Sequence, residues 1–137
     1  MPWLRRPGTC VGWRAVVEVA GMSGVRLSDA MGDVNQCIVA SQSCQASCEA
    51  AMKQLVARGM RVDSEPMRLL RQCAELCELN VRALRKDSKL SRRTATLCFE
   101  LGNELARAAW LDSNVASAAL AEDALQLASA CRPLLLT

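Results

Sequence analysis

Cysteines at helical spacing constrain the fold of this chain more than any other feature. Cys37, Cys44 and Cys48 follow one another at intervals of seven and four residues, with no glycine or proline between them. Residues at this spacing lie on one face of an α-helix. The four-residue interval returns at Cys73 and Cys77, so we expect at least two helices that carry thiols on one face.

The composition also favours helices. Aromatic residues make up 3% of the 137 residues and tyrosine is absent, whereas hydrophobic residues make up 51%. Strands are enriched in aromatic and β-branched residues, while alanine and leucine are strong helix formers. A chain of this length is long enough for one domain with a hydrophobic core.

Capping and breaking residues place the first two helices. Asp33 and Gln36 have the spacing of a capping box, so the first helix is predicted to begin at Asp33 and to end before Gly59. The second is predicted to open at residues 63–66, because proline is tolerated in a first turn. Its core-facing stripe comprises Leu69, Leu70, Cys73, Leu76, Cys77, Asn80 and Leu84.

Two more helices are expected in the second half of the chain. The third is predicted to begin near Ser91, and the fourth to run from about residue 114 to Cys131, where Arg132 and Pro133 end it. The buried face of the third helix is predicted to comprise Leu97, Cys98, Leu101, Leu105 and Ala109. Short turns between helices of this length require antiparallel neighbours.

The predicted fold is therefore all-α, an antiparallel up-down-up-down four-helix bundle. We expect a poorly ordered N-terminal extension at residues 1–32, the bundle at residues 33–132 and a C-terminal tail at residues 133–137. Cys10 lies in the extension, and we assign it no function. A two-helix hairpin with a disordered remainder is the alternative, which the regular recurrence of caps and apolar stripes disfavours.

The levels of the thiols follow if each turn of an antiparallel bundle is treated as a mirror. Reflection about the turn centres brings five thiols into one group: Cys44, Cys48, Cys73, Cys77 and Cys98. The remaining pair, Cys37 and Cys131, is predicted to share the other end of the bundle. Met52, four residues after Cys48, extends the same helix face with a thioether.

Clustered sulfur ligands in a dry interior favour Cu(I), with Zn(II) or an iron–sulfur cluster as competitors. Structural zinc sites more often use tighter loops, and the usual ferredoxin spacings are absent. The candidate copper ligands are Cys37, Cys44, Cys48, Cys73, Cys77, Cys98, Cys131 and Met52. The alternative is that these cysteines are ordinary core residues, because a buried free cysteine behaves as a small apolar side chain.

Reduced thiols in a cytoplasmic protein fit the sequence better than disulfides in a secreted one. Arg14 and Glu18 interrupt the apolar run that a signal peptide would need. Cysteines four apart on one helix have Cβ atoms about 5–6 Å apart, which is beyond disulfide reach. No uncharged run approaches the roughly 20 residues of a membrane span, so no membrane partner is expected.

The charge pattern does not predict a polyanionic partner. The net charge is +3, and acids and bases are mixed except between Arg82 and Arg93, where six bases accompany one acid. This segment falls between two predicted helices, contains no aromatic residue for stacking and matches no groove-binding motif. We interpret it as a solvated turn and expect no nucleic-acid partner.

These cysteine motifs resemble those of the cysteine-rich four-helix-bundle copper storage proteins, whose helices carry Cys-x3-Cys-x2-Cys-x3-Cys runs that line the bundle interior. Residues 37–48 look like such a run with Ser41 in place of one cysteine. Residues 73–77 resemble the motif of the second helix, and residues 82–88 are similar to the turn into the third. The resemblance covers residues 34 to 132 and implies the same bundle.

The chain departs from the family where further cysteines would be expected. The matching positions hold mostly apolar residues, namely Ala51, Leu55, Pro66, Gly102, Leu105, Ala109, Ser117, Leu120, Ala124 and Leu127. Histidine is absent, so any family histidine that assists metal entry has no counterpart. The resemblance therefore implies copper binding at a lower capacity than the family motif provides.

Two functions remain open on the sequence. The first is non-enzymatic, low-capacity Cu(I) binding or storage inside the bundle. The second is a helical interaction or oligomerisation module without metal function, suggested by the apolar replacements and by Trp110, and a homo-oligomer is compatible with both. A thiol redox enzyme is disfavoured, because the chain has no Cys-x-x-Cys motif and no histidine.

Overall fold

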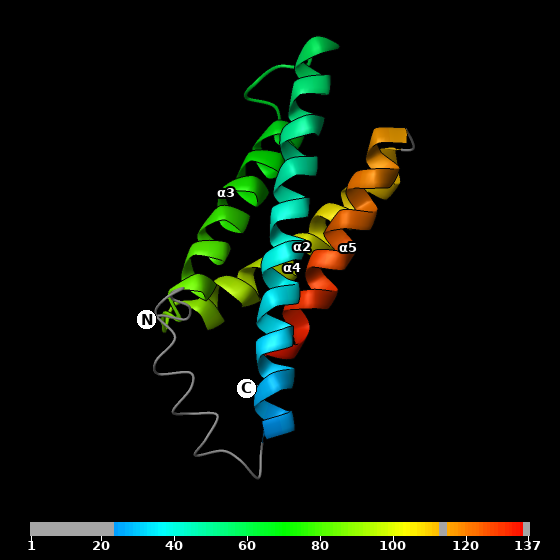
Figure 1. The fold of residues 1–137 in the computed structure, drawn as a ribbon. Coiled ribbons are helices and arrows are strands. Elements are labelled where there is room, and N and C mark those ends of the chain that lie inside the picture. The colour runs from blue at the N-terminus through cyan, green and yellow to red at the C-terminus, as the bar shows by residue number, and fades with distance from the viewer. Residues whose placement is uncertain (1–23, 113–114, 136–137) are drawn as a thin grey trace.

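The computed structural model describes residues 24–112 and 115–135, including the side chains of residues 31–108 and 118–135. The described residues form four helices and no strand: α2 (Gly24–Ala57), α3 (Glu65–Arg85), α4 (Ser91–Asp112) and α5 (Val115–Leu135). Their arrangement is shown in Figure 1. The all-α prediction is confirmed.

The four helices close into a ring. α2 packs against α3, α3 against α4, α4 against α5, and α5 returns to α2. Consecutive helices run in opposite directions, as Figure 1 shows. α2 is the longest, with 34 residues against 21 or 22 in the others, and extends beyond its neighbours at both ends. This is the predicted up-down-up-down four-helix bundle.

The first helix begins earlier than predicted. α2 starts at Gly24, so Asp33 and Gln36 lie inside the helix and form no capping box. Gly32 is exposed and faces open space. An isolated glycine costs an exposed helix only about 1 kcal/mol, so it does not interrupt α2. The remainder of the predicted extension, residues 1–23 with Cys10, lies outside the described residues.

The last helix ends later than predicted. α5 continues through Pro133 to Leu135, past the expected end at Cys131. Proline offers no N–H to the preceding turn, which normally disfavours a helix interior. Here Leu134 and Leu135 pack against the core, and this contact favours one further turn.

Two of the connections are matching helix caps. After α2, Gly59 N–H donates to the Val56 carbonyl and Met60 N–H to the Leu55 carbonyl, both at 2.9 Å. This is the Schellman pattern, in which the residue after the cap adopts positive φ, here +93° at Gly59. After α3 the same pattern places Asp87 at φ +50°. All six basic residues of segment 82–93 flank this second cap and are exposed.

The start of α3 agrees with the prediction. Ser64 is the N-cap residue and Pro66 lies in the first turn. A proline costs little there, because its missing N–H would have had no helical partner. Every member of the predicted α3 stripe is buried or half-buried.

The apolar half of the core lies between α4 and α5. A Cβ added at Gly102 would lie 2.9 Å from the Ala124 carbonyl oxygen, so the two backbones approach closely at this level. This contact turns the Gly102 face of α4 inward and leaves Leu97, predicted to be buried, 44% exposed. Thr94 and Ala95 are buried instead, and the Ala109 side chain lies outside the described residues.

Candidate metal centre

All seven described cysteines are free thiols inside the bundle. None is more than 1% exposed. They come from all four helices, with three on α2, two on α3, and one each on α4 and α5. The predicted inward direction of the thiols is therefore what the structure shows.

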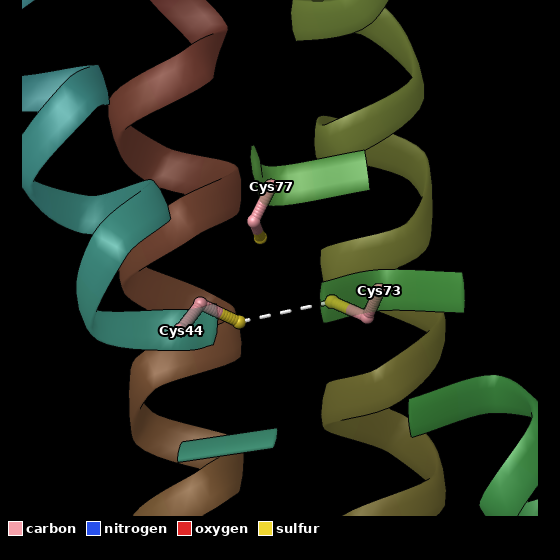
Figure 2. Close-up of side chains that lie close together, drawn as sticks. All are labelled: Cys44, Cys73 and Cys77. Atoms are coloured by element: carbon pink, nitrogen blue, oxygen red, sulfur yellow. Dashed lines mark hydrogen bonds between the residues drawn. The ribbon is translucent and has the colours of Figure 1, made fainter. Parts of the chain in front are cut away.

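The tightest group joins α2 and α3. The sulfur atoms of Cys44, Cys73 and Cys77 all lie within 4.8 Å of one another. The Cys44 and Cys73 sulfurs are 3.8 Å apart, and Figure 2 shows both directed into the space between the two helices. Cys48, one turn from Cys44, also interacts with Cys44 and Cys73. The predicted convergence of these four thiols agrees with the geometry.

A second pair joins α2 and α5. The sulfur atoms of Cys37 and Cys131 lie 3.1 Å apart, although 94 residues separate them in sequence. Both side chains are fully buried. The mirror calculation predicted that these two cysteines share a level, and the structure places them in contact.

Cys98 was predicted to belong to the group of five alone. In the structure it connects the two groups. Its thiol interacts with Cys77 on one side and with Cys131 on the other. Its sulfur also lies 3.8 Å from the Leu76 carbonyl oxygen, to which the S–H donates. The seven thiols therefore form one continuous tract, and the predicted division into five and two is wrong in this respect.

Neighbouring thiols set the acidity of the tract. Cys73 accepts hydrogen bonds from neighbouring thiols, and these hold its pKa far below its ordinary value. The S–H of Cys44 has the largest effect, and those of Cys48 and Cys77 have smaller effects. The Cys37 thiol does the same for Cys131 and lowers its pKa to about 5. One thiolate in each group is thus stabilised by S–H donors at neutral pH.

Three of the buried thiols, Cys37, Cys48 and Cys77, are correspondingly hard to ionise. Hydrogen bonds to Cys44 and Cys73, together with burial, raise the pKa of Cys48 and of Cys77. The hydrogen bond to Cys131, together with burial, raises the pKa of Cys37. Because metals bind the thiolate form, a metal ion must displace these protons.

A buried polar network lies beside the thiols. Asn80 of α3 is 0% exposed, and its amide Nδ2 donates to Ser41 Oγ at 3.1 Å and to Cys37 Sγ at 3.4 Å. Its Oδ1 accepts from Thr94 Oγ1 of α4 at 2.7 Å. The candidate list drawn from the sequence missed these residues. The signal for them was an asparagine on the core-facing stripe of α3.

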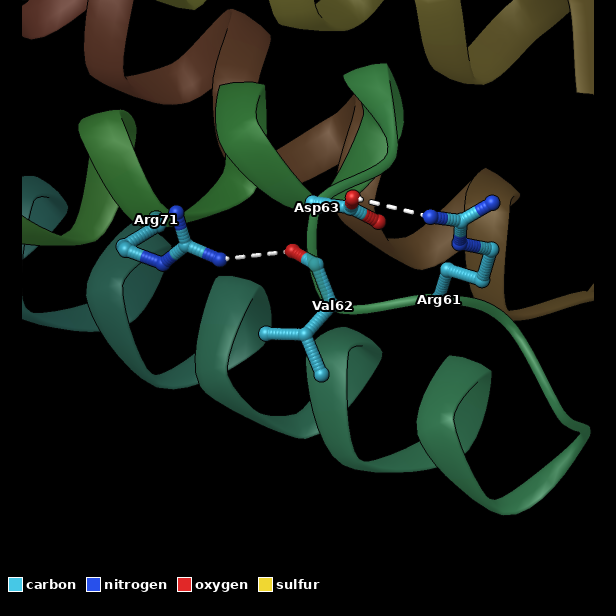
Figure 3. Close-up of polar contacts among 4 residues, drawn as sticks. All are labelled: Arg61, Val62, Asp63 and Arg71. Carbon is cyan, nitrogen blue, oxygen red and sulfur yellow. Dashed lines mark hydrogen bonds and ion pairs between the residues drawn. The ribbon is translucent and has the colours of Figure 1, made fainter.

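Met52 and the surface depression contribute less to the centre. Met52 is half-buried and packs against the edge of the core. An open depression of about 600 Å³ lies at the α2–α3 turn, lined by Arg61, Val62, Asp63 and Arg71. As Figure 3 shows, Arg71 donates to the Val62 carbonyl at 2.8 Å, and Arg61 pairs with Asp63 at 3.1 Å. Both guanidinium groups therefore bond within the turn, and no described thiol is among the residues that line the depression.

The arrangement of thiols agrees with a comparison to known families. The family model described as copper storage protein matches residues 27–136. This chain belongs to the copper storage protein family. No curated protein sequence matches it. Within the part of the chain that the structure describes, no helix is long and apolar enough to cross a membrane.

A solved member of the copper storage protein family has a similar fold. The structure titled "Cu(I)-bound Copper Storage Protein BsCsp3" superposes with a TM-score of 0.69 at 23% sequence identity. The match covers 74% of this chain and 97% of the other. At this level of identity the likeness concerns the four-helix bundle itself.

Proposed function

We propose that this member of the copper storage protein family binds and stores Cu(I) through thiolates inside the bundle. The observation that carries the proposal is the packing of the Cys44, Cys73 and Cys77 sulfurs within 4.8 Å of one another in a buried space. Soft thiolate ligands select Cu(I) over harder cations. Zinc is less well matched, because its structural sites are closed tetrahedra built largely on loops.

The proposed ligands are the seven described thiols, with Met52 at the edge. Each copper ion is held by two thiolates, either within one helix at the i, i+4 spacing or between helices. The full set is Cys37, Cys44, Cys48, Cys73, Cys77, Cys98, Cys131 and Met52. Capacity is low because α4 and α5 supply one cysteine each.

The remaining parts of the proposal follow from this chemistry. The role is storage and not catalysis, since the chain contains no histidine to act as an acid, a base or an activator of a nucleophile. Free thiols fit a reducing cytoplasm. The partners are the metal ion and further copies of the chain in a homo-oligomer, without nucleic acid or membrane.

Anaerobic titration with Cu(I) against a chromophoric chelator tests the proposal. The wild-type protein should withhold copper from the chelator, and the Cys44→Ser/Cys73→Ser variant should lose most of this capacity while keeping its helix content by circular dichroism. Cys10→Ser is the matched control and should bind as the wild type does. A wild-type protein that withholds no copper at substoichiometric metal would refute the function.

The apolar half of the bundle favours a second candidate, a helical interaction module without metal function. Leu105, Leu120 and Leu127 fill positions where the family motif has cysteine, and Leu97 is exposed on α4. The side chain of Trp110, which also suggested this function, lies outside the described residues. The module predicts a melting temperature that is unaffected by Cu(I) or by a copper chelator, so a copper-dependent melting temperature excludes it.

A further inference from the structure

The polar network of Ser41, Asn80 and Thr94 connects three helices in the centre of the bundle. Asn80 on α3 hydrogen-bonds to Ser41 on α2 and to Thr94 on α4, and Thr94 is only 2% exposed. Buried polar groups are retained at a cost in desolvation that hydrogen bonds must offset. This network also reaches a thiol, because the same amide nitrogen lies 3.4 Å from Cys37 Sγ.

Thr94 sets the direction of the Asn80 amide. The Thr94 hydroxyl lies 2.7 Å from Asn80 Oδ1 and 3.0 Å from the Ser91 carbonyl oxygen, so these two acceptors share its single proton. Asn80 Oδ1 is thereby engaged on the α4 side. The amide N–H groups consequently face α2, where Ser41 Oγ and Cys37 Sγ accept them.

In the copper-loaded state the Asn80 N–H would face the negative charge of the copper–thiolate site, and this inference rests on the proposed function. Two thiolates and one Cu(I) together carry a net negative charge, which is costly in a dry interior unless hydrogen-bond donors face it. Donors to a metal-bound thiolate also orient it and tune the affinity of the site. Among the residues whose side chains the structure describes, 31–108 and 118–135, Asn80 is the side-chain N–H donor that reaches a thiol sulfur.

We propose that Asn80 is a positioning residue for copper, whose amide N–H holds the Cys37 thiolate beside Cys131 and makes that pair a second copper site in the thiol tract, linked through Cys98 to the Cys44–Cys73–Cys77 cluster. The 3.1 Å contact between the Cys37 and Cys131 sulfurs supplies the two ligands. Thr94 acts through Asn80, because its hydroxyl donates to Asn80 Oδ1 and so orients the Asn80 amide. Among the described residues, the sulfur that Asn80 bonds is that of Cys37 and not one of the Cys44–Cys73–Cys77 cluster, so we expect Asn80→Leu to leave copper binding at that cluster unchanged.

A double-mutant cycle tests this coupling in the full-length protein. Asn80→Leu is measured in the wild-type background and in Cys37→Ala, each by anaerobic Cu(I) competition with a chromophoric chelator. Asn80→Leu should weaken the Cys37-dependent copper equivalent by about 10–100-fold, the usual cost of losing a partner of a metal ligand. In the Cys37→Ala background it should have no effect on the copper that is still bound. Any general loss of stability appears in both backgrounds and cancels in the cycle.

Ser41→Ala is the matched control, because it removes a hydroxyl from the same buried network and leaves the N–H to Cys37. It should not weaken the Cys37-dependent equivalent. Thr94→Val keeps Asn80 in place and removes only the hydroxyl that orients it, so a smaller loss in the same direction is expected. If Asn80→Leu has less helix content than the wild type by circular dichroism, the copper affinity of Thr94→Val tests the role of Asn80 in its place. The thiolate-to-copper charge-transfer absorption in the ultraviolet counts the copper–sulfur bonds independently.

The outcomes separate this inference from the proposed function. A loss confined to the background that retains Cys37 supports the role of Asn80. An equal loss in both backgrounds, or no loss in Asn80→Leu and Thr94→Val, overturns it even though the protein binds copper. A wild-type protein that withholds no copper overturns the proposed function and this inference together.

Discussion

The two halves of the bundle differ in what fills their interior. α2 and α3 contribute five of the seven described cysteines, whereas α4 and α5 contribute one each. At the inward positions of α4 and α5, side chains of leucine and alanine are packed to 6% exposure or less: Leu105, Ala106, Leu120, Ala121, Ala124, Leu127 and Ala128. The interior of one half thus combines five thiols with apolar side chains, and the interior of the other is an ordinary hydrophobic core.

The difference shows how one bundle separates chemistry from stability. A buried thiol packs like a small apolar side chain, so helices that carry cysteine and helices that carry alanine can share one ring. The close approach of α4 and α5 at Gly102 requires small side chains and leaves no room there for a ligand. We therefore expect variants in the α4–α5 half to change stability and variants among the thiols to change copper binding.

The largest expected effect on stability is at Leu127. This side chain is 0% exposed, and Leu127→Ala should lower the free energy of unfolding by about 2–5 kcal/mol through lost burial and the cavity left behind. The number of Cu(I) ions withheld from a chelator by the folded protein should not change. Leu125→Ala, two residues away and 47% exposed, should stay within about 0.5 kcal/mol of the wild type in the same denaturation experiment. If folded Leu127→Ala bound fewer copper ions than the wild type, the apolar core and the copper-binding thiols would not be independent.

Gly102→Ala should have the next largest effect on the free energy of unfolding. The new Cβ would lie 2.9 Å from the Ala124 carbonyl oxygen, so the helices must move apart at a cost of about 1–3 kcal/mol. Gly32→Ala offers the matched comparison, because no atom lies within 4 Å of that Cβ. It should stabilise α2 by about 0.5–1 kcal/mol. Chemical denaturation of both variants measures the contrast, and equal effects would contradict the close contact.

Copper binding by the thiols should instead depend on pH. With the Cys131 pKa at about 5, that thiol is ionised at neutral pH, whereas the raised pKa of Cys37 keeps its proton. Copper held by this pair therefore releases one proton, and its affinity should fall about tenfold, or about 1.4 kcal/mol, for each pH unit lowered between about pH 8 and 6. Competition titrations at several pH values, compared with Cys37→Ala, measure the slope. An affinity independent of pH, or a slope of two protons, would contradict this assignment.

The smallest effect is expected at the turn that joins the two halves. Asp87 adopts φ +50°, a conformation that glycine reaches without steric cost, so Asp87→Gly should raise the free energy of unfolding by about 0.5 kcal/mol. Gly59→Ala, at the equivalent position after α2, should lower it by about 1 kcal/mol. Thermal melts would resolve both signs. Copper binding should be the same in both variants, since neither position touches a thiol.

Much of this organisation could be predicted from the sequence. Periodic spacing fixed the inward faces of Cys44, Cys48, Cys73 and Cys77, and short turns made the helices antiparallel. Simple reflection about the turns then brought Cys37 beside Cys131. These features depend on helix geometry alone, which is the same in every context.

The remainder depends on contacts between helices, which spacing does not encode. The inward face of α4 is set by the approach of α5 at Gly102, so Leu97 was wrongly predicted to be buried. Cys98 connects both thiol groups because α4 lies next to α3 and α5. Asn80 could be recognised as a polar residue on an apolar stripe, but its partners Ser41 and Thr94 are 39 and 14 residues away in sequence.

The complete burial of the seven thiols also determines how fast a metal ion can reach them. None of these cysteines is more than 1% exposed, so we expect metal exchange with the solvent to require a transient opening between the helices. Such openings in native proteins range from local fraying to global unfolding. The rate of loading is therefore a property of breathing motions in the bundle. A sequence change that rigidifies the helices slows both uptake and release, even where the affinity stays the same.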